Sequence, residues 1–200
     1  MQLLGTELSV NLLNDPMFRF GPAVNYRFGR KDSVHDVVVK QMTELKDTVE
    51  AGAFVGAVFA DAKDPRQRFV LNLEYLHDVG GHYKGGNFTL SGRYWIPISR
   101  PIDVSLGASA TYADSKYMNY YFSVTPQNVG TSGLPLFDAS GGTRDLSISP
   151  AVVYHFSKEW HLGIGARYQR LVGDAKDSPV VAIRGSANQV IAGLAAIYSW

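Results

Sequence analysis

The sequence predicts an all-β protein, an up-and-down antiparallel transmembrane β-barrel that forms a single domain over residues 1–200. Three observations predict this class. Apolar and polar residues alternate with a period of two, the alternating runs are about ten residues long, and the links between them are alternately short and long. A tilted strand of about ten residues crosses a bilayer, so the runs have the length of membrane-spanning strands.

The alternation is clearest in the run 102–113, where Val104 and Leu106 alternate with Asp103 and Ser105. Because successive side chains of a strand point to opposite faces, such a run has one continuous apolar face. About nine runs of this kind occur, at 4–12, 18–28, 49–59, 69–75, 88–96, 102–113, 145–156, 160–169 and 190–200.

The number of runs is odd, whereas single-chain bacterial barrels normally close with an even number of strands. The first run begins near residue 1, and no export signal with a basic start and a long apolar segment precedes it. We therefore expect about ten to twelve strands in the complete protein, with the signal and the first strands missing from residues 1–200. Pro22 and Pro150 lie inside two runs, and each removes a donor from a strand ladder.

The links between the runs predict the orientation. The links at 14–17, 61–67, 99–101 and 157–159 are short, those at 29–48, 114–142 and 173–187 are long, and the link at 77–87 is of medium length. Transmembrane barrels have short periplasmic turns and long outer loops, so the chain should end on the periplasmic side.

Aromatic residues are concentrated at this expected periplasmic rim. Tyr154, Phe156 and Trp160 flank the turn 157–159, and Tyr198 and Trp200 close the last run. Rings with a polar edge favour a membrane interface, so these five residues are candidates for an interfacial aromatic belt.

Alternation alone leaves a soluble barrel or sandwich open as an alternative, with the apolar face turned inward. The unequal links, the aromatic residues at strand ends and the small residues on the polar face favour the membrane. The charged residues on the polar face should then pair with one another in a narrow lumen, because an unpaired buried charge is costly. These residues are Arg27, Glu50, Glu74, Arg93, Asp145 and Arg167.

The composition argues against several function classes. The net charge of +1 gives no reason to expect nucleic acid as a partner. With no cysteine, the chain has no disulfide, no thiolate metal site and no thiol nucleophile. No nucleophile stands at a recognisable spacing from a base, and His77, Asp78 and His82 are only a weak metal cluster. We therefore expect no catalytic, cofactor-binding or metal-binding residues.

The link 173–187 carries three charged residues that are candidates for pinning the loop over the barrel mouth. Arg184 can reach Asp174 or Asp177 with the planar fork of its guanidinium group. The alternative is a site at Arg184 for an anionic sugar or a lipid phosphate.

The links 114–142 and 29–48 carry further candidates. Tyr117, Tyr120, Tyr121 and Phe122 form either an exposed interaction surface or, through Tyr120 and Phe122, the extension of a strand above the membrane. In 33–47, apolar residues recur at helical spacing and predict a short amphipathic helix that braces or plugs the mouth.

Several stretches resemble the MipA/OmpV family of outer-membrane proteins. They are GPAVNYRFGR, TVEAGAFVGAVF, DVGGHYKG, YYFSVTPQNVGTSGLPLFDASGGTRDLSISP and LVGDAKDSPVVAIRGSANQ, and they follow one another along nearly the whole chain. The resemblance implies a non-catalytic barrel in the outer membrane of a Gram-negative cell, in contact with its lipid. It also implies a scaffold that binds a lytic transglycosylase and a peptidoglycan synthase.

The last run also resembles the signal that the barrel-assembly machinery reads, with Tyr198 and Trp200 at its aromatic positions and Ala195 where glycine is common. Two other functions remain open from the sequence. One is a narrow channel for small solutes, which a polar lumen favours, and the other is a surface adhesin built on the long outer loops.

Overall fold

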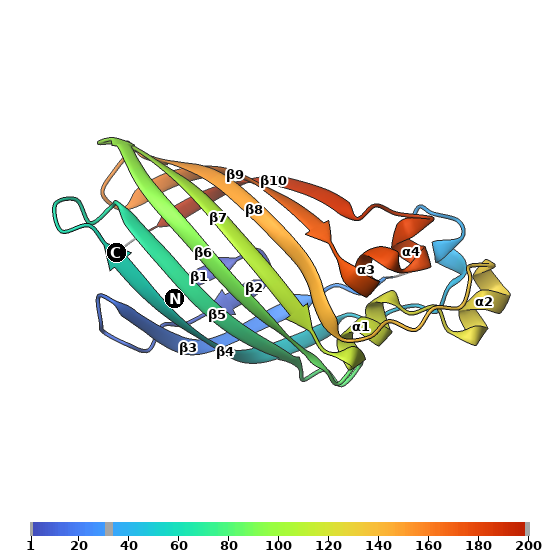
Figure 1. The fold of residues 1–200 in the computed structure, drawn as a ribbon. Coiled ribbons are helices and arrows are strands. Elements are labelled where there is room, and N and C mark those ends of the chain that lie inside the picture. Colours follow the sequence, from blue (N-terminus) through green and yellow to red (C-terminus); the bar gives the residue numbers. More distant parts are fainter. Residues whose placement is uncertain (1, 31–33, 199–200) are drawn as a thin grey trace.

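The computed structural model describes residues 2–30 and 34–198, and in this part of the chain ten strands form one curled antiparallel sheet (Figure 1). Each strand pairs with the next in sequence, from β1 to β10, so the sheet is an up-and-down meander. The strands are β1 (Gln2–Leu4), β2 (Glu7–Ser9), β3 (Phe18–Arg27), β4 (Thr48–Ala60), β5 (Arg68–Asp78), β6 (Gly86–Ser99), β7 (Ile102–Ala113), β8 (Gly142–His155), β9 (Trp160–Leu171) and β10 (Asn188–Tyr198).

The predicted strand 4–12 is wrong in detail, because the chain forms a hairpin there. Gly5 has a φ of +60° and makes the tight turn between β1 and β2, a conformation that glycine adopts without strain. The turn adds one strand to the nine that the alternation predicts. The other eight runs are confirmed as β3 to β10.

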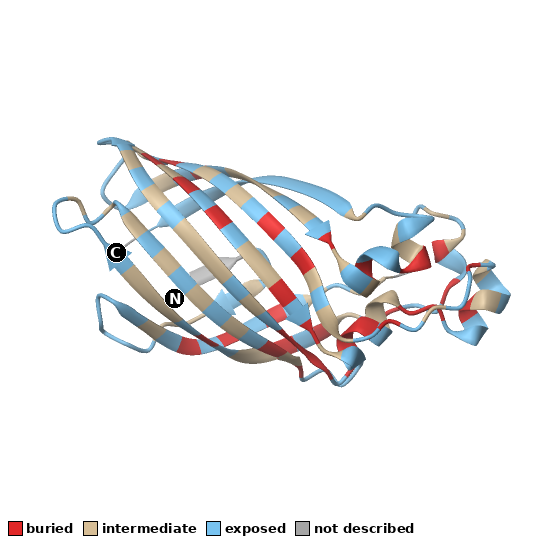
Figure 2. Cartoon of the chain, viewed as in Figure 1, coloured by how far each residue is buried: buried red, intermediate tan, exposed pale blue. Residues whose placement is uncertain are grey.

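The apolar face of the sheet points outward and the polar face points into the lumen. Leu106, Ile164 and Leu194 keep 59%, 58% and 76% of their surface exposed, whereas Ser105 and Asp145 keep 1% and 0%. Figure 2 shows the same alternation of exposure along the middle strands of the sheet, whereas β10 is exposed along its whole length. A soluble barrel would bury its apolar face, so the structure has the arrangement of a transmembrane barrel.

Pro150 lies where the ladder between β8 and β9 is interrupted. Ile148 pairs with Tyr168 and Ala151 with Gly165, and no pair lies between them. Proline has no N–H group to donate, so it is tolerated at this irregularity.

The two ends of the sheet differ as the link lengths predict. The links 10–17, 61–67, 100–101 and 156–159 lie at one end, here called the turn end, and the longer links lie at the other, here called the capped end. The links at the capped end carry η1 (Val39–Gln41), α1 (Ser115–Phe122), α2 (Pro126–Ser132), α3 (Gly173–Asp177) and α4 (Pro179–Ala182), which gather into a cap (Figure 1). Among the described residues, none of these helices is long and apolar enough to cross a membrane.

The predicted amphipathic helix in 33–47 is wrong, because over the described residues 34–47 only the single 3₁₀ turn η1 forms. The bracing that we expected of this segment is nevertheless present: Met42 packs in a buried cluster with Val124 and Leu134. Two of the apolar side chains at helical spacing, Val38 and Met42, are thus packed in one cluster without a full helix.

Candidate functional site

An ion pair between Arg27 and Glu50 lies at the centre of the residues that close the capped end of the lumen. Glu50 is fully buried and accepts hydrogen bonds from Arg27 Nε at 2.7 Å and Arg27 Nη2 at 3.0 Å. It also accepts one from Asn25 Nδ2 at 2.7 Å and one from the hydroxyl of Tyr83. A buried carboxylate with this many donors is fully satisfied, so the pair fixes the ends of β3 and β4 to the link 79–85.

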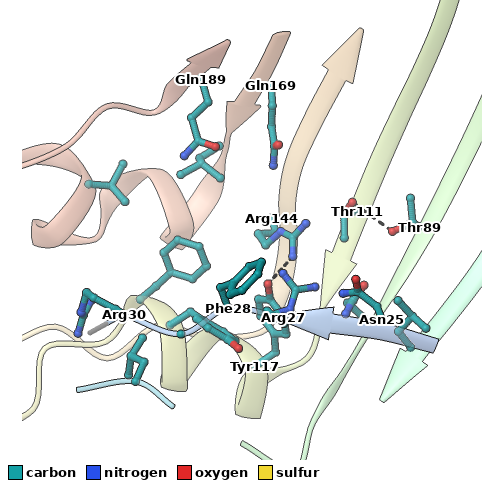
Figure 3. Close-up of a pocket in the computed structure, with 18 of the residues that line it drawn as sticks. Asn25, Arg27, Phe28, Arg30, Thr89, Thr111, Tyr117, Arg144, Gln169 and Gln189 are labelled. Carbon is teal, nitrogen blue, oxygen red and sulfur yellow. Dashed lines mark hydrogen bonds between the residues drawn. The ribbon is translucent and has the colours of Figure 1, made fainter. Parts of the chain in front are cut away.

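A second ion pair joins Arg144 and Asp145 on β8. Arg144 Nε lies 2.5 Å from Asp145 Oδ2, and Arg144 Nη1 donates to the hydroxyl of Tyr117 at 2.5 Å (Figure 3). The guanidinium carbons of Arg27 and Arg144 lie 5.3 Å and 5.1 Å from the centre of the Tyr117 ring. Tyr117 therefore joins both ion pairs through cation–π contacts as well as through a hydrogen bond.

The sequence analysis missed Arg144 because regular alternation places neighbouring residues of a strand on opposite faces. The register between β7 and β8 shifts at this point: Thr111 pairs with Asp145 and Tyr112 pairs with Thr143. Arg144 is the extra residue of this β-bulge, which turns its side chain toward the lumen beside Asp145.

The aromatic residues predicted as an exposed interaction surface lie inside the cap. Tyr117 is 3% exposed, and Tyr120, Tyr121 and Phe122 are partly buried against the cap core of Tyr83, Ala113, Met118, Ala139, Leu171 and Ala175. The segment is helix α1, which Asp114 caps by accepting from the Tyr117 N–H, so these residues do not extend a strand either. Both interpretations of this segment from the sequence are wrong, because the helix turns its aromatic face toward the lumen. Burial raises the pKa of the Tyr83 and Tyr121 hydroxyls, and for Tyr83 the hydrogen bond to Glu50 adds to the rise.

The expected partners of Arg184 are also wrong. Arg184 Nη2 lies 2.8 Å from Asp36 Oδ2, so it joins the link 172–187 to the link 28–47. Asp174 instead accepts from the backbone N–H of Ser140 at 2.7 Å, and Asp177 forms an exposed pair with Lys176 at 3.2 Å. Pro179 starts a new helix after Asp177, which separates Arg184 from both acidic residues.

A cavity of about 580 Å³ lies between the cap and the sheet. Its wall combines arginine, carboxamide and threonine side chains with aromatic and aliphatic ones (Figure 3). Gln169 and Gln189 reach into it from β9 and β10. The hydroxyl oxygens of Thr89 and Thr111 lie 3.3 Å apart on its floor. Below it, Arg93 on β6 lies along the inner face of the sheet and donates to Ser105 Oγ on β7 and Ser149 Oγ on β8, each at 2.8 Å.

The pairing expected within the lumen is confirmed for Arg27 with Glu50, and Arg167 lies 3.8 Å from Asp145. Arg93 bonds to serines, and Glu74 contacts Glu7 instead of a cation.

The aromatic residues at the turn end lie where the sequence places them. Tyr154, Phe156, Trp160 and Tyr198 are exposed at this rim, and the rings of Trp160 and Tyr198 are 5.0 Å apart. Trp200 lies outside the described residues. Their roles in a membrane belt and in an assembly signal stay predictions.

Asp78, the carboxylate of the weak metal cluster, is engaged in other contacts. Asp78 accepts from Thr48 Oγ1 and from the backbone N–H groups of Gly81, Tyr83 and Lys84, so it organises the link 79–85. Within residues 2–30 and 34–198, no three His, Cys, Asp or Glu side chains gather in a metal-binding arrangement.

Fold and site together define a meandering barrel sheet with an apolar outer face, a polar lumen and a helical cap held by buried ion pairs. This class fits proteins of the outer membrane. Residues 2–200 match the family described as MltA-interacting protein MipA, and the chain belongs to this family. A comparison with curated proteins gave no match.

Proposed function

We propose that the protein is a non-catalytic scaffold of the outer membrane, which binds a lytic transglycosylase and, through it or beside it, a peptidoglycan synthase. The observation that carries this proposal is the family match over residues 2–200, because the family is described by its interaction with MltA, a lytic transglycosylase. In the proposed orientation the turn end faces the periplasm, where such enzymes act on the cell wall.

The turn end has the order that a docking surface needs. Arg66 Nη1 donates to the carbonyl oxygens of Ser99 and Arg100 at 2.9 Å and 3.3 Å, and Arg66 Nη2 lies 2.9 Å from Asp64 Oδ2. This network ties the turn 61–67 to the turn 100–101 and holds the pKa of Asp64 below its usual range. A preorganised surface loses little conformational entropy when a partner binds.

Another turn at this end is also fixed by local hydrogen bonds. Ser157 Oγ accepts from the backbone N–H groups of Glu159 and Trp160 at 3.1 Å and 2.9 Å, which closes the turn 156–159. Lys63, Arg100 and Lys158 are exposed around the rim and would give a partner a charged surface to recognise.

The experiment is a capture assay with the purified transglycosylase and the detergent-solubilised barrel. Reversing charge at the turn end with Lys63→Glu and Lys158→Glu should reduce capture, whereas Lys116→Glu at the capped end should leave it unchanged. Capture no greater than that by an unrelated barrel would refute the scaffold, and equal loss in both variants would refute docking at the turn end.

A narrow channel is the second candidate, and the polar cavity of about 580 Å³ is the observation that favours it. Arg93 and the paired serines Ser109 and Ser147 line the inner face of the sheet below this cavity, so the wall along which a solute would pass is polar. Planar-bilayer recording tests this candidate: discrete conductance steps would support it, and a silent bilayer with inserted protein would reject it.

A further inference from the structure

The four arginines that line the cavity beneath the cap differ in how their donors are used. Arg27 and Arg144 are satisfied by Glu50 and Asp145. Arg30 donates only a long bond to the carbonyl oxygen of Thr43 at 3.4 Å, and it has no carboxylate partner among the described residues. The cavity therefore has a cation at its mouth that no carboxylate of the described residues compensates.

Arg167 on β9 is the second arginine with unused donors. Its Nη2 lies 3.8 Å from Asp145 Oδ1, which is long for a hydrogen bond, and its Nε is buried without a partner. Because Arg144 already holds the other oxygen of Asp145, Arg167 is left with donors that fit an incoming carboxylate.

The acidic groups of the cavity lie on other strands. Glu7 on β2 and Glu74 on β5 both line it, and their carboxyl groups lie next to each other. No lysine, arginine or histidine of residues 2–30 and 34–198 forms an ion pair with either one. An ammonium group of a ligand would supply the missing positive charge here.

Between these two charged regions the wall carries carboxamide groups. Gln169 and Gln189 point into the cavity in Figure 3, and Asn87, which is 4% exposed, has an Nδ2 group buried without a partner. A carboxamide offers both a donor and an acceptor, as a peptide bond does, and an unsatisfied buried donor is unfavourable until a ligand fills it.

We propose that this cavity binds a short zwitterionic peptide, with the peptide carboxylate at Arg30 and Arg167 and the amino group at Glu7 and Glu74. The carboxamides then bond to the peptide backbone, and Leu45, Val180 and Val181 contact its side chains. The volume of about 580 Å³ lies within the roughly 300–1,000 Å³ of small-molecule sites. The site is distinct from the turn end and independent of the scaffold proposed above.

Three probes test the proposal on the detergent-solubilised protein by titration calorimetry: trialanine, N-acetyl-trialanine and trialanine amide. The free peptide should bind at least about tenfold more tightly than either blocked peptide, because each block removes one charge-assisted contact. Absence of binding by trialanine, or equal binding of all three probes, would overturn the proposal.

Substitutions in the cavity test which protein groups bind the carboxylate and which bind the amino group of the peptide. Arg167→Gln should weaken trialanine binding and remove the preference for the free carboxylate over the amide, whereas Glu74→Gln should remove the preference for the free amine. Arg170→Gln is the matched control, because Arg170 is exposed on the same strand. All variants must keep the far-ultraviolet circular dichroism of the unsubstituted protein. Unchanged discrimination in both Arg167→Gln and Glu74→Gln would overturn the assignment.

Discussion

Replacing Glu50 by alanine should destabilise the barrel more than any exposed substitution does. The change removes the carboxylate that Arg27, Asn25 and Tyr83 share and leaves the Arg27 guanidinium uncompensated. Breaking a buried ion pair costs about 3–5 kcal/mol. Because the Arg27 side chain is 25% exposed, water recovers part of this loss, and we expect a decrease of about 3 kcal/mol in the free energy of unfolding.

Urea unfolding in lipid vesicles, followed by tryptophan fluorescence, measures this change. The double variant Arg27→Met/Glu50→Ala should be less destabilised than Glu50→Ala alone, because it no longer contains the unpaired cation. Glu44→Ala is the control, since Glu44 is exposed in the link 28–47, and its effect should stay within about 0.5 kcal/mol. If Glu50→Ala also stayed within that range, the ion pair would not hold the capped end together.

Three other predictions concern the cap and the outer face. Arg184 holds the pKa of Asp36 below its usual range, so this ion pair should protect the link 28–47 from protease above about pH 4 and lose its effect as the pH falls through the lowered pKa. Asp36→Asn should abolish that pH dependence. Met118 is 1% exposed in the cap core, so Met118→Ala should lower the free energy of local unfolding of the cap by about 2–5 kcal/mol. Hydrogen exchange should then become faster in α1 and stay unchanged in β7. Leu106→Arg on the outer face should lower the free energy of unfolding in lipid by about 2–4 kcal/mol, whereas Val37→Arg, at an exposed position in a link, should change it little.

The strands were predictable from the sequence because a period of two persists along each run and one face is apolar throughout. The hairpin at Gly5 was not, since each of its strands covers only three residues and is too short to show a period. The inward position of Arg144 depends on a one-residue bulge, which reverses the face expected from alternation.

The cap was less predictable than the sheet. Helix α1 spans two turns, which is too short for a clear helical pattern, and its tyrosines are equally compatible with exposure or burial. The ion pair between Asp36 and Arg184 joins residues 148 positions apart in the sequence, so nothing local indicates it. The pairing of Arg27 with Glu50 could be expected, because two charges on inward-facing positions of neighbouring strands seldom remain apart in a narrow lumen.

The direction in which the apolar face points can be measured with single cysteines, because the natural chain contains none. Spin labels at Leu106→Cys and Ala108→Cys report on the outer face of β7, and one at Ser109→Cys reports on the lumen, where Ser109 contacts Ser147 at 2.8 Å. In lipid vesicles, the labels at 106 and 108 should be relaxed by oxygen, which concentrates in the bilayer, and the label at 109 should not. Preferential relaxation of the labels at 106 and 108 by a water-soluble nickel complex would contradict the barrel described above.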